Sequence, residues 1–229
     1  MKRRTVPLHI SLIPDGNRRW AVRQGLKKTK GYSVIAYDFL EGLFLEAKRL
    51  GIEYFSFWGF STENWNRPKK EIDFLFNHFL KNSAALLNGA IKYKIGIKHI
   101  GRKDRLPKKV VQELKRLEEA TENYQAFTLQ LCMDYGGRDE LIRAVNKIIQ
   151  SGVKEINEKQ ISSFLDTDDV PDPDLIIRTS GEQRTSGFMP YQSTYAELYF
   201  SSVYFPDFGP EQLREAVEEF ARRKRNFGA

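Results

Sequence analysis

The stretch His9-Ile-Ser-Leu-Ile-Pro-Asp-Gly-Asn-Arg-Arg-Trp20 runs from an apolar segment through a turn into a basic, helix-compatible segment. The apolar part is typical of a buried strand, and the Pro14–Asn17 part is typical of a tight turn. α/β proteins bind anions at such junctions, because backbone N–H groups and the positive end of the helix converge there. Mg²⁺ takes carboxylate and phosphate oxygens together, so Asp15 here indicates a metal–diphosphate site. A turn or helix-cap role for Asp15 is an equally good interpretation of the spacing alone.

Composition and charge limit the class of protein. The chain has 229 residues, 41% of them hydrophobic and 13% aromatic, which is typical of a globular chain with ample length for a core. Its net charge of +7 fits nucleic acid, an anionic membrane or anionic small substrates as partners. The single cysteine, Cys132, excludes an intramolecular disulfide and fits a reducing cytosol. Because no run approaches the ~18 apolar residues of a membrane span, we expect one cytoplasmic domain over residues 1–229, with contact to a membrane surface left open.

Short apolar runs alternate with longer segments of helical periodicity, which predicts an α/β fold with a central, mostly parallel six-stranded sheet flanked by helices. In the segment 31–50, Ile35, Phe39, Leu43 and Ala47 recur every four residues, so one apolar stripe faces a core. Strands are expected at about 7–14, 53–60, 95–100, 126–134, 174–179 and 196–200. Helices are expected at about 17–24, 31–50, 69–93, 107–123, 137–151, 158–165 and 210–225.

Polar loops with arginines follow the predicted strands. They are Ser61–Pro68, Asp134–Asp139 and Thr179–Ser186, in addition to the turn after the first strand. Ligands of such sheets bind beyond the carboxyl ends of the strands, so four such loops on one rim predict a positively charged pocket for two anionic heads. Arginine binds phosphate through a planar fork of donors. The arginines that we expect on phosphate oxygens are Arg19, Arg67, Arg178 and Arg184.

Three further residues have two interpretations each. Glu197 lies inside an apolar run, where a carboxylate must be paired or metal-bound unless it faces solvent on an exposed strand. Trp20 flanks the expected pocket, and core packing is its more ordinary role. Lys28 belongs to a basic run that is either a solvated surface or a loop that gathers phosphate. The histidines and the cysteine show no zinc-ligand spacing.

Five motifs together resemble the cis-prenyltransferases, the undecaprenyl diphosphate synthase family. They are Asp15–Ala21, Phe60–Pro68, Asp134–Arg138, Arg178–Arg184 and Tyr195–Phe200, and their order and spacing hold from His9 to Gly228. The resemblance implies a homodimer whose subunits carry a central parallel sheet and a hydrophobic tunnel. It also implies Mg²⁺, an allylic diphosphate and, as the usual acceptor, isopentenyl diphosphate, and no nucleic-acid partner.

The resemblance also assigns roles by position. Asp15 matches the metal-binding aspartate of the family, and Glu197 matches a glutamate that supports the metal or the second site across the dimer. Ser61 and Asn64 match residues that position the acceptor and help to remove a proton. Substrate binding is then expected from Gly16, Asn17, Arg18, Arg19 and Arg67 on the allylic side and from Arg178, Arg184 and Ser186 on the acceptor side. Trp20, Lys28 and Tyr32 are also expected to bind substrate.

The sequence departs from the family pattern around the basic loop before Gly31 and beside the expected acceptor site. Tyr32 and Lys28 stand where the family usually has histidine and arginine, and Gly187 and Met189–Tyr191 replace its usual residues near the acceptor. These changes resemble the branch that makes irregular, lavandulyl-type couplings. A short or medium-chain head-to-tail product is expected, with a second dimethylallyl diphosphate as the alternative acceptor.

Two other classes compete with this interpretation. A non-catalytic subunit of a two-component prenyltransferase tends to lose the aspartate and arginine motifs, which this chain keeps. A nucleic-acid-binding module has only the charge in its favour, because the arginines gather at strand ends. The tunnel wall is expected on helix 69–93, which carries Phe74, Phe76, Phe79, Leu80 and Leu87, and periodicity does not decide which of its phenylalanines faces inward.

Overall fold

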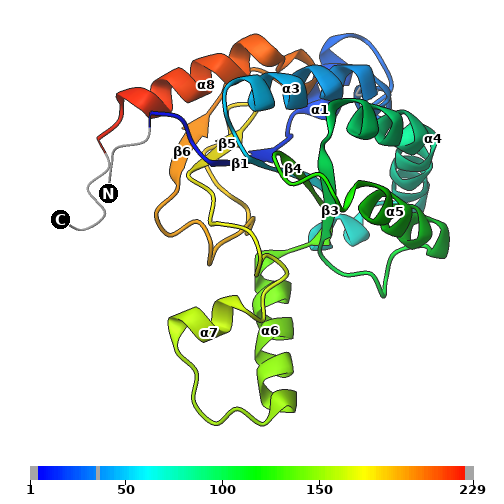
Figure 1. Cartoon of the computed structure of the whole chain (residues 1–229). Helices are drawn as coiled ribbons and strands as arrows, with labels where there is room; N and C mark the ends of the chain where they lie inside the picture. Colours follow the sequence, from blue (N-terminus) through cyan, green and yellow to red (C-terminus); the bar gives the residue numbers. More distant parts are fainter. Residues whose placement is uncertain (1–4, 35–36, 225–229) are drawn as a thin grey trace.

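Six parallel strands form the centre of the fold in a computed structural model that describes residues 5–34 and 37–224. The strand order is β3-β4-β2-β1-β5-β6, so the first strand lies in the middle of the sheet (Figure 1). All six strands fall where the sequence predicted them. Their bounds are β1 (His9–Ile13), β2 (Tyr54–Ser61), β3 (Gly96–Ile100), β4 (Thr128–Tyr135), β5 (Leu175–Arg178) and β6 (Glu197–Phe200).

The helices also follow the prediction, with one difference. The segment predicted as one helix over 31–50 contains two helices, α2 and α3, on either side of residues 35 and 36. Ile35 of the expected stripe lies outside the described residues, whereas Leu43 and Ala47 are buried as expected. The bounds are α1 (Asn17–Arg23), α2 (Lys30–Ser33), α3 (Tyr37–Arg49), α4 (Lys69–Tyr93), α5 (Lys108–Thr121), α6 (Gly137–Ser151), α7 (Glu158–Ser162) and α8 (Pro210–Arg222), with short 3-10 turns η1 (Thr62–Asn66) and η2 (Phe205–Asp207).

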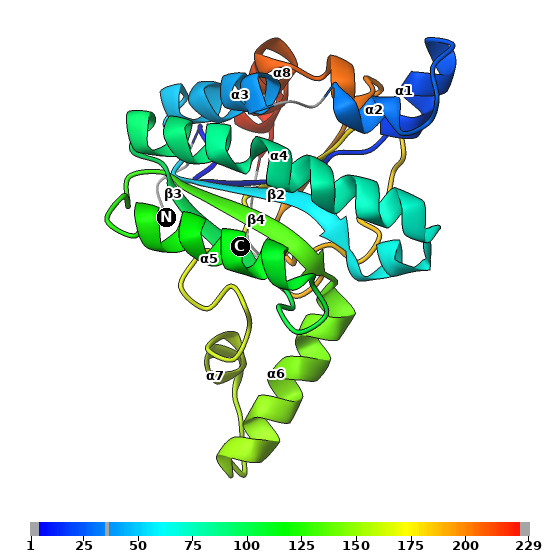
Figure 2. The ribbon, with the colours of Figure 1, turned by 90° about the vertical axis from the view of Figure 1, so that its right-hand side faces the viewer.

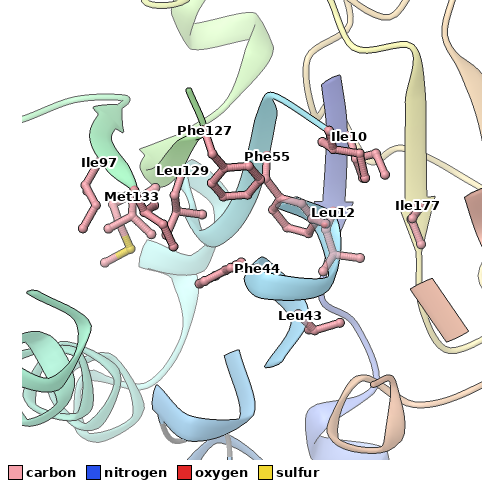
Figure 3. Packing of buried hydrophobic residues seen from close by; sticks show 14 of the residues in the cluster. Ile10, Leu12, Leu43, Phe44, Phe55, Ile97, Phe127, Leu129, Met133 and Ile177 are labelled. Atoms are coloured by element: carbon pink, nitrogen blue, oxygen red, sulfur yellow. The ribbon is translucent and has the colours of Figure 1, made fainter. Parts of the chain in front are cut away.

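The larger core lies between one face of the sheet and the helices α3, α4, α5 and α8. Figure 3 shows part of it, where β1, β2 and β4 meet α3. Phe44 of α3 packs edge-on against Phe55 of β2, with ring centroids 5.5 Å apart. Both side chains are almost completely buried. This packing fixes α3 against the middle strands and leaves the carboxyl edge of the sheet for the turns that follow the strands.

The second face of the sheet is covered in a different way. The loop between β5 and β6 folds back under the sheet, and Phe188 stacks on Trp58 of β2 with ring centroids 4.6 Å apart. Phe188 and Met189 are fully buried there with Ile13 and Tyr135. Figure 2 shows α6 projecting away from the body of the molecule on this side. The expected helical cover on this face is therefore partly replaced by an irregular segment.

The register of the parallel strands brings distant turns together. Ile13 of β1 pairs with Arg178 of β5, so the turns after these two strands start side by side. On the other side of β1, Leu12 pairs with Phe57, and β2 continues to Ser61. Among the described helices, none is long and apolar enough to span a bilayer.

Candidate active site

A cavity of about 680 Å³ opens at the carboxyl edge of the sheet and extends along α4. Its polar lining comes from the turns after β1, β2 and β5 and from α1, α2 and α4, and its apolar lining comes from the core strands and helices. Two carboxylates, Asp15 and Glu63, face four lining arginines, so the lining carries excess positive charge. Eleven of the residues predicted from the sequence line this cavity: Asp15, Gly16, Asn17, Arg18, Arg19, Tyr32, Ser61, Asn64, Arg67, Arg178 and Ser186.

Asp15 joins two of the turns. Its Oδ2 accepts a hydrogen bond from Arg178 at 2.9 Å and a longer one from Arg19 at 3.3 Å. Its Oδ1 accepts from the backbone N–H of Gly16 at 2.6 Å. Burial alone would raise the pKa of Asp15, but these hydrogen bonds and the charges of both arginines hold that pKa below its ordinary value. The side chain is therefore an ionised carboxylate at neutral pH.

Backbone conformation and close packing fix the turn around Asp15. Gly16 has a φ of +98°, which L side chains rarely adopt, and a Cβ there would lie 2.8 Å from Cβ of Ser180. Gly31 of α2 packs so closely on α1 that a Cβ would lie 1.8 Å from the carbonyl oxygen of Asn17. The two glycines let α1 approach both the β5 turn and α2, which brings their polar groups into one cavity.

Arg178 ties the acceptor-side turn to Asp15. Its side chain is 7% exposed, and its Nη1 donates to the carbonyl oxygen of Arg184 and to Oγ of Ser186, each at 2.7 Å. Its buried Nε has no hydrogen-bond partner among the described residues. Arg19 extends the same network, since it donates to Oγ of Ser180 at 2.6 Å and to Glu182 at 2.7 Å. A buried cation with an unused donor is the chemistry of an anion-binding site.

Tyr32 belongs to a second cluster, at the start of α4. Arg67 donates to the Tyr32 hydroxyl at 2.7 Å and to Glu71 at 3.0 Å, and its guanidinium lies 5.9 Å from the centre of the tyrosine ring. Arg18 approaches the same Glu71 carboxylate at 3.9 Å. Burial raises the pKa of Tyr32, against the opposing charge of Arg67, so the phenol stays protonated at neutral pH. At this position Tyr32 therefore supplies a hydrogen-bonding hydroxyl that neither gains nor loses a proton near neutral pH.

Ser61 and Asn64 are placed by the 3-10 turn that follows β2. The backbone N–H of Ser61 donates to Oδ1 of Asn64 at 3.2 Å, in a capping arrangement that fixes both side chains at the cavity. Next to them, the indole N–H of Trp65 donates to the buried carboxylate of Asp134 at 2.8 Å. The end of β4, where the polar segment Asp134–Asp139 begins, therefore supports this turn from behind. Our expectation that this segment itself lines the pocket was wrong, because Asp134 is fully buried and Arg138 points to solvent.

Four predicted site residues lie outside the cavity lining. The indole of Trp20 donates to Asp207 at 2.8 Å, Lys28 is exposed, and the Arg184 side chain pairs with Glu182. Glu197 pairs with Leu175 at the start of β6, which is the strand end away from Arg178, and its carboxylate accepts from Arg223 at 2.9 Å. Within one chain, Glu197 therefore does not reach Asp15, and a role at the metal stays a prediction that requires a second copy.

The residues of α4 that line the cavity differ from those expected. Of the five side chains expected on the tunnel wall, only Phe79 lines the cavity. Phe76 is buried instead against Phe60 and Trp65. Sequence reasoning also missed His78, Asn82 and Ser83, because polar residues on a helix were not sought in an apolar tunnel. The available signal was the spacing: Asn82 and Ser83 follow Phe79 by three and four residues, and His78 lies four residues before Asn82.

The comparisons with known proteins identify the family of the chain. The family model described as "Putative undecaprenyl diphosphate synthase" matches residues 13–228. An isoprenyl transferase of Aquifex pyrophilus is 42% identical over 97% of this chain and 96% of its own length. One of Thermotoga maritima is 40% identical over 97% of each chain.

Two solved structures are similar over almost their whole length. Lavandulyl diphosphate synthase from Lavandula x intermedia, solved in complex with dimethylallyl diphosphate, has a TM-score of 0.93 at 30% identity, covering 98% of this chain and 99% of that one. A probable undecaprenyl diphosphate synthase from Campylobacter jejuni has a TM-score of 0.82 at 32% identity, covering 97% and 99%. From its sequence motifs, its sheet and these relatives together, the chain belongs to the undecaprenyl diphosphate synthase family and is a cis-prenyltransferase.

Proposed function

We propose that the cavity condenses an allylic diphosphate with isopentenyl diphosphate, head to tail and in the cis geometry, to a short or medium-chain polyprenyl diphosphate. The condensation itself is the activity that membership of this family supports. The observation that carries the assignment to this cavity is the position of Asp15. Its carboxylate is held between Arg19, from α1, and Arg178, from β5, so two anion-binding clusters meet at one carboxylate.

The two clusters would bind the two substrates. The N-terminal end of α1, with Gly16, Asn17, Arg18 and Arg19, fits the allylic diphosphate. Arg178 and Ser186 fit the acceptor diphosphate, since Arg178 already contacts Ser186 and keeps an unused donor. Holding both diphosphates in one cavity places the allylic carbon beside the acceptor double bond, which lowers the entropic part of the barrier.

In the proposed reaction the bond between the allylic carbon and the diphosphate oxygen breaks, and the acceptor double bond forms a new carbon–carbon bond with that carbon. Arg18 and Arg19 stabilise the charge that develops on the departing diphosphate. A proton then leaves the acceptor, either to the released diphosphate or through Ser61 and Asn64, which the turn after β2 holds at the cavity.

Magnesium is part of the proposal, and the residues present fit it. No group of three or more histidine, cysteine or acidic side chains in residues 5–34 and 37–224 could hold a metal ion unaided. A single ionised carboxylate such as Asp15, completed by diphosphate oxygens and water, is the usual environment of Mg²⁺ with phosphate substrates. When bound, the ion would neutralise charge on the leaving diphosphate.

We also propose that the chain acts as a homodimer. Glu197 lies at the exposed edge strand β6, away from its own cavity, and is tied to Arg223. In a homodimer this carboxylate could serve the partner's site instead. Sedimentation of the purified protein tests this proposal, and a monomer at assay concentrations that retains full activity would contradict it.

The irregular coupling is the second candidate. The lavandulyl diphosphate synthase neighbour and the Met189–Tyr191 segment are in its favour, but the curated relatives at about 40% identity are isoprenyl transferases. Tyr32, which stands where the family usually has histidine, contacts Arg67 and Glu71. This substitution changes the hydrogen bond at the position and leaves the arginines in place. The regular condensation is therefore preferred.

The test is an incubation of the wild-type chain and an Asp15→Asn variant with Mg²⁺, labelled isopentenyl diphosphate and each allylic primer in turn. The proposal predicts a ladder of polyprenyl products from the wild type and almost none from the variant. A parallel incubation with dimethylallyl diphosphate alone tests the irregular coupling. Product in that arm only would reject the regular condensation, and no product in any arm would favour a non-catalytic subunit.

A further inference from the structure

The wall of the cavity contributed by α4 is half polar. Six residues of this helix line the cavity, and their spacing of three and four residues places them on one face. Three of them, Leu75, Phe79 and Leu86, are apolar, as expected for a channel that takes a hydrocarbon chain. The other three, which interrupt the apolar stripe, are His78, Asn82 and Ser83.

These polar residues form a continuous band. The side-chain amide of Asn82 donates to the backbone carbonyl of His78 at 2.8 Å, one helical turn away. The same amide lies 3.4 Å from Nε2 of the His78 ring. Ser83 is buried beside them and donates to the carbonyl of Leu80. The band is thus a fixed part of the helix surface.

The band lies further along α4 than the diphosphate end of the cavity. Glu71 marks the diphosphate end of α4, because it contacts Arg67 and Arg18. His78 and Asn82 follow seven and eleven residues later, which corresponds to roughly 10–17 Å along a helix of 1.5 Å rise per residue. A chain that grows from the diphosphate end therefore meets Leu75 first and the polar band next.

We propose that His78 and Asn82 set the length of the product. This inference rests on the proposed function, since it concerns the chain that the reaction elongates. Each condensation pushes the hydrocarbon tail further along α4. Once the tail reaches the band, the next addition must remove water from an imidazole and an amide and replace it with hydrocarbon, which is unfavourable. Elongation then slows relative to product release, and the chain ends at that length.

The size of Phe79 offers a competing explanation for the product length, because its ring lines the cavity on the same stretch of α4. The two explanations differ for a substitution that removes polarity without opening space. The double variant His78→Leu/Asn82→Leu replaces both polar side chains by apolar ones and leaves Phe79 in place. Asn77→Leu is the matched control, since Asn77 is exposed on the same helix. The single variant His78→Leu serves if the double variant does not fold.

The experiment sizes the dephosphorylated products of each variant, with labelled isopentenyl diphosphate and one fixed primer. The expected result is a shift of the main product by at least one isoprene unit in the leucine variants, with the ratio of the next longer product to the wild-type product up about tenfold. Asn77→Leu should match the wild type. An unchanged or shorter product from a variant that still incorporates label would overturn the inference.

Failure of the proposed function would look different from failure of this inference. If the wild type incorporates no label at all, the condensation is rejected. If it does incorporate label and only truncation by Phe79→Ala lengthens the product, size sets the length and polarity does not.

Discussion

Arg178 is the residue on which the two clusters of the site depend. It is almost fully buried, contacts Asp15, Ser186 and the Arg184 backbone, and reaches them with two nitrogens of one planar group. Lysine keeps the charge but lacks the fork, so Arg178→Lys should lose at least one of these charged hydrogen bonds. We expect kcat/KM for isopentenyl diphosphate to fall about 10- to 100-fold, measured by label incorporation at low substrate concentration.

Arg116→Lys is the control for that substitution, because Arg116 lies on the exposed side of α5 and pairs with Glu113 of the same helix. It should leave kcat/KM unchanged. Equal kinetics for Arg178→Lys and the wild type would mean that the fork of Arg178 has no part in holding the acceptor.

His9 gives the fold a dependence on pH. It is buried in the middle of the sheet, between the carbonyl of Pro171 at 2.7 Å and the hydroxyl of Ser56 at 2.8 Å. Burial lowers its pKa from 6.5 to about 4, against the raising effects of Pro171 and Asp174. The unfolded chain therefore binds a proton between these values that the folded chain does not, so stability is lost as pH falls from about 6.5 toward 4.

At pH 5 this single group should lower the free energy of unfolding by about 2 kcal/mol relative to pH 7. Urea unfolding at both pH values measures the change. His9→Gln, which cannot titrate, should show a correspondingly smaller difference between the two pH values. If wild type and variant lose the same stability, His9 is not responsible.

At the level of elements, the segment between β5 and β6 replaces a helix on the second face of the sheet. Phe188 anchors this segment between Trp58 and Tyr135, and Ser186 lies two residues before it. Phe188→Ala should lower the free energy of unfolding by about 3–5 kcal/mol, because it removes a fully buried ring. It should also raise KM for isopentenyl diphosphate, because Ser186 and Arg184 lose their support.

Urea unfolding and initial rates below the unfolding transition check both parts of that prediction. Phe74→Ala is the comparison, since Phe74 is a partly exposed phenylalanine of α4 that stacks on His78. A loss of stability below 1 kcal/mol for Phe188→Ala would show that the segment is held by something other than this ring.

For the molecule as a whole, the helices and strands could be predicted from the sequence more fully than the contacts between them. Every strand and most helices followed from periodicity, because an apolar run or stripe determines its own conformation. The end of α2 at Ser33, inside the segment predicted as one helix over 31–50, did not follow from periodicity. The contacts of Tyr32 with Arg67 and Glu71, which lie far away in sequence, are not contained in that local pattern either.

The site residues could likewise be predicted where a local pattern places them, and not where distant contacts do. Residues next to strand ends, such as Asp15 and Arg178, could be predicted because parallel strands bring their carboxyl ends to one edge. The face that α4 turns toward the cavity could not, because α4 is packed on several sides and its phenylalanines serve the core as well as the channel. The placement of Glu197 away from its own cavity follows from the register of β6 against β5, which no local pattern contains.

The measurement that tests the central claim most directly is a crystal structure of the chain with Mg²⁺, isopentenyl diphosphate and a thiolo analogue of an allylic diphosphate that cannot ionise. The account predicts one diphosphate at the start of α1 beside Arg18 and Arg19, with the metal ion on Asp15. It predicts the second diphosphate on Arg178 and Ser186, and the allylic tail along α4 toward His78. A diphosphate bound outside this cavity, or a tail that leaves the cavity without contacting α4, would contradict it.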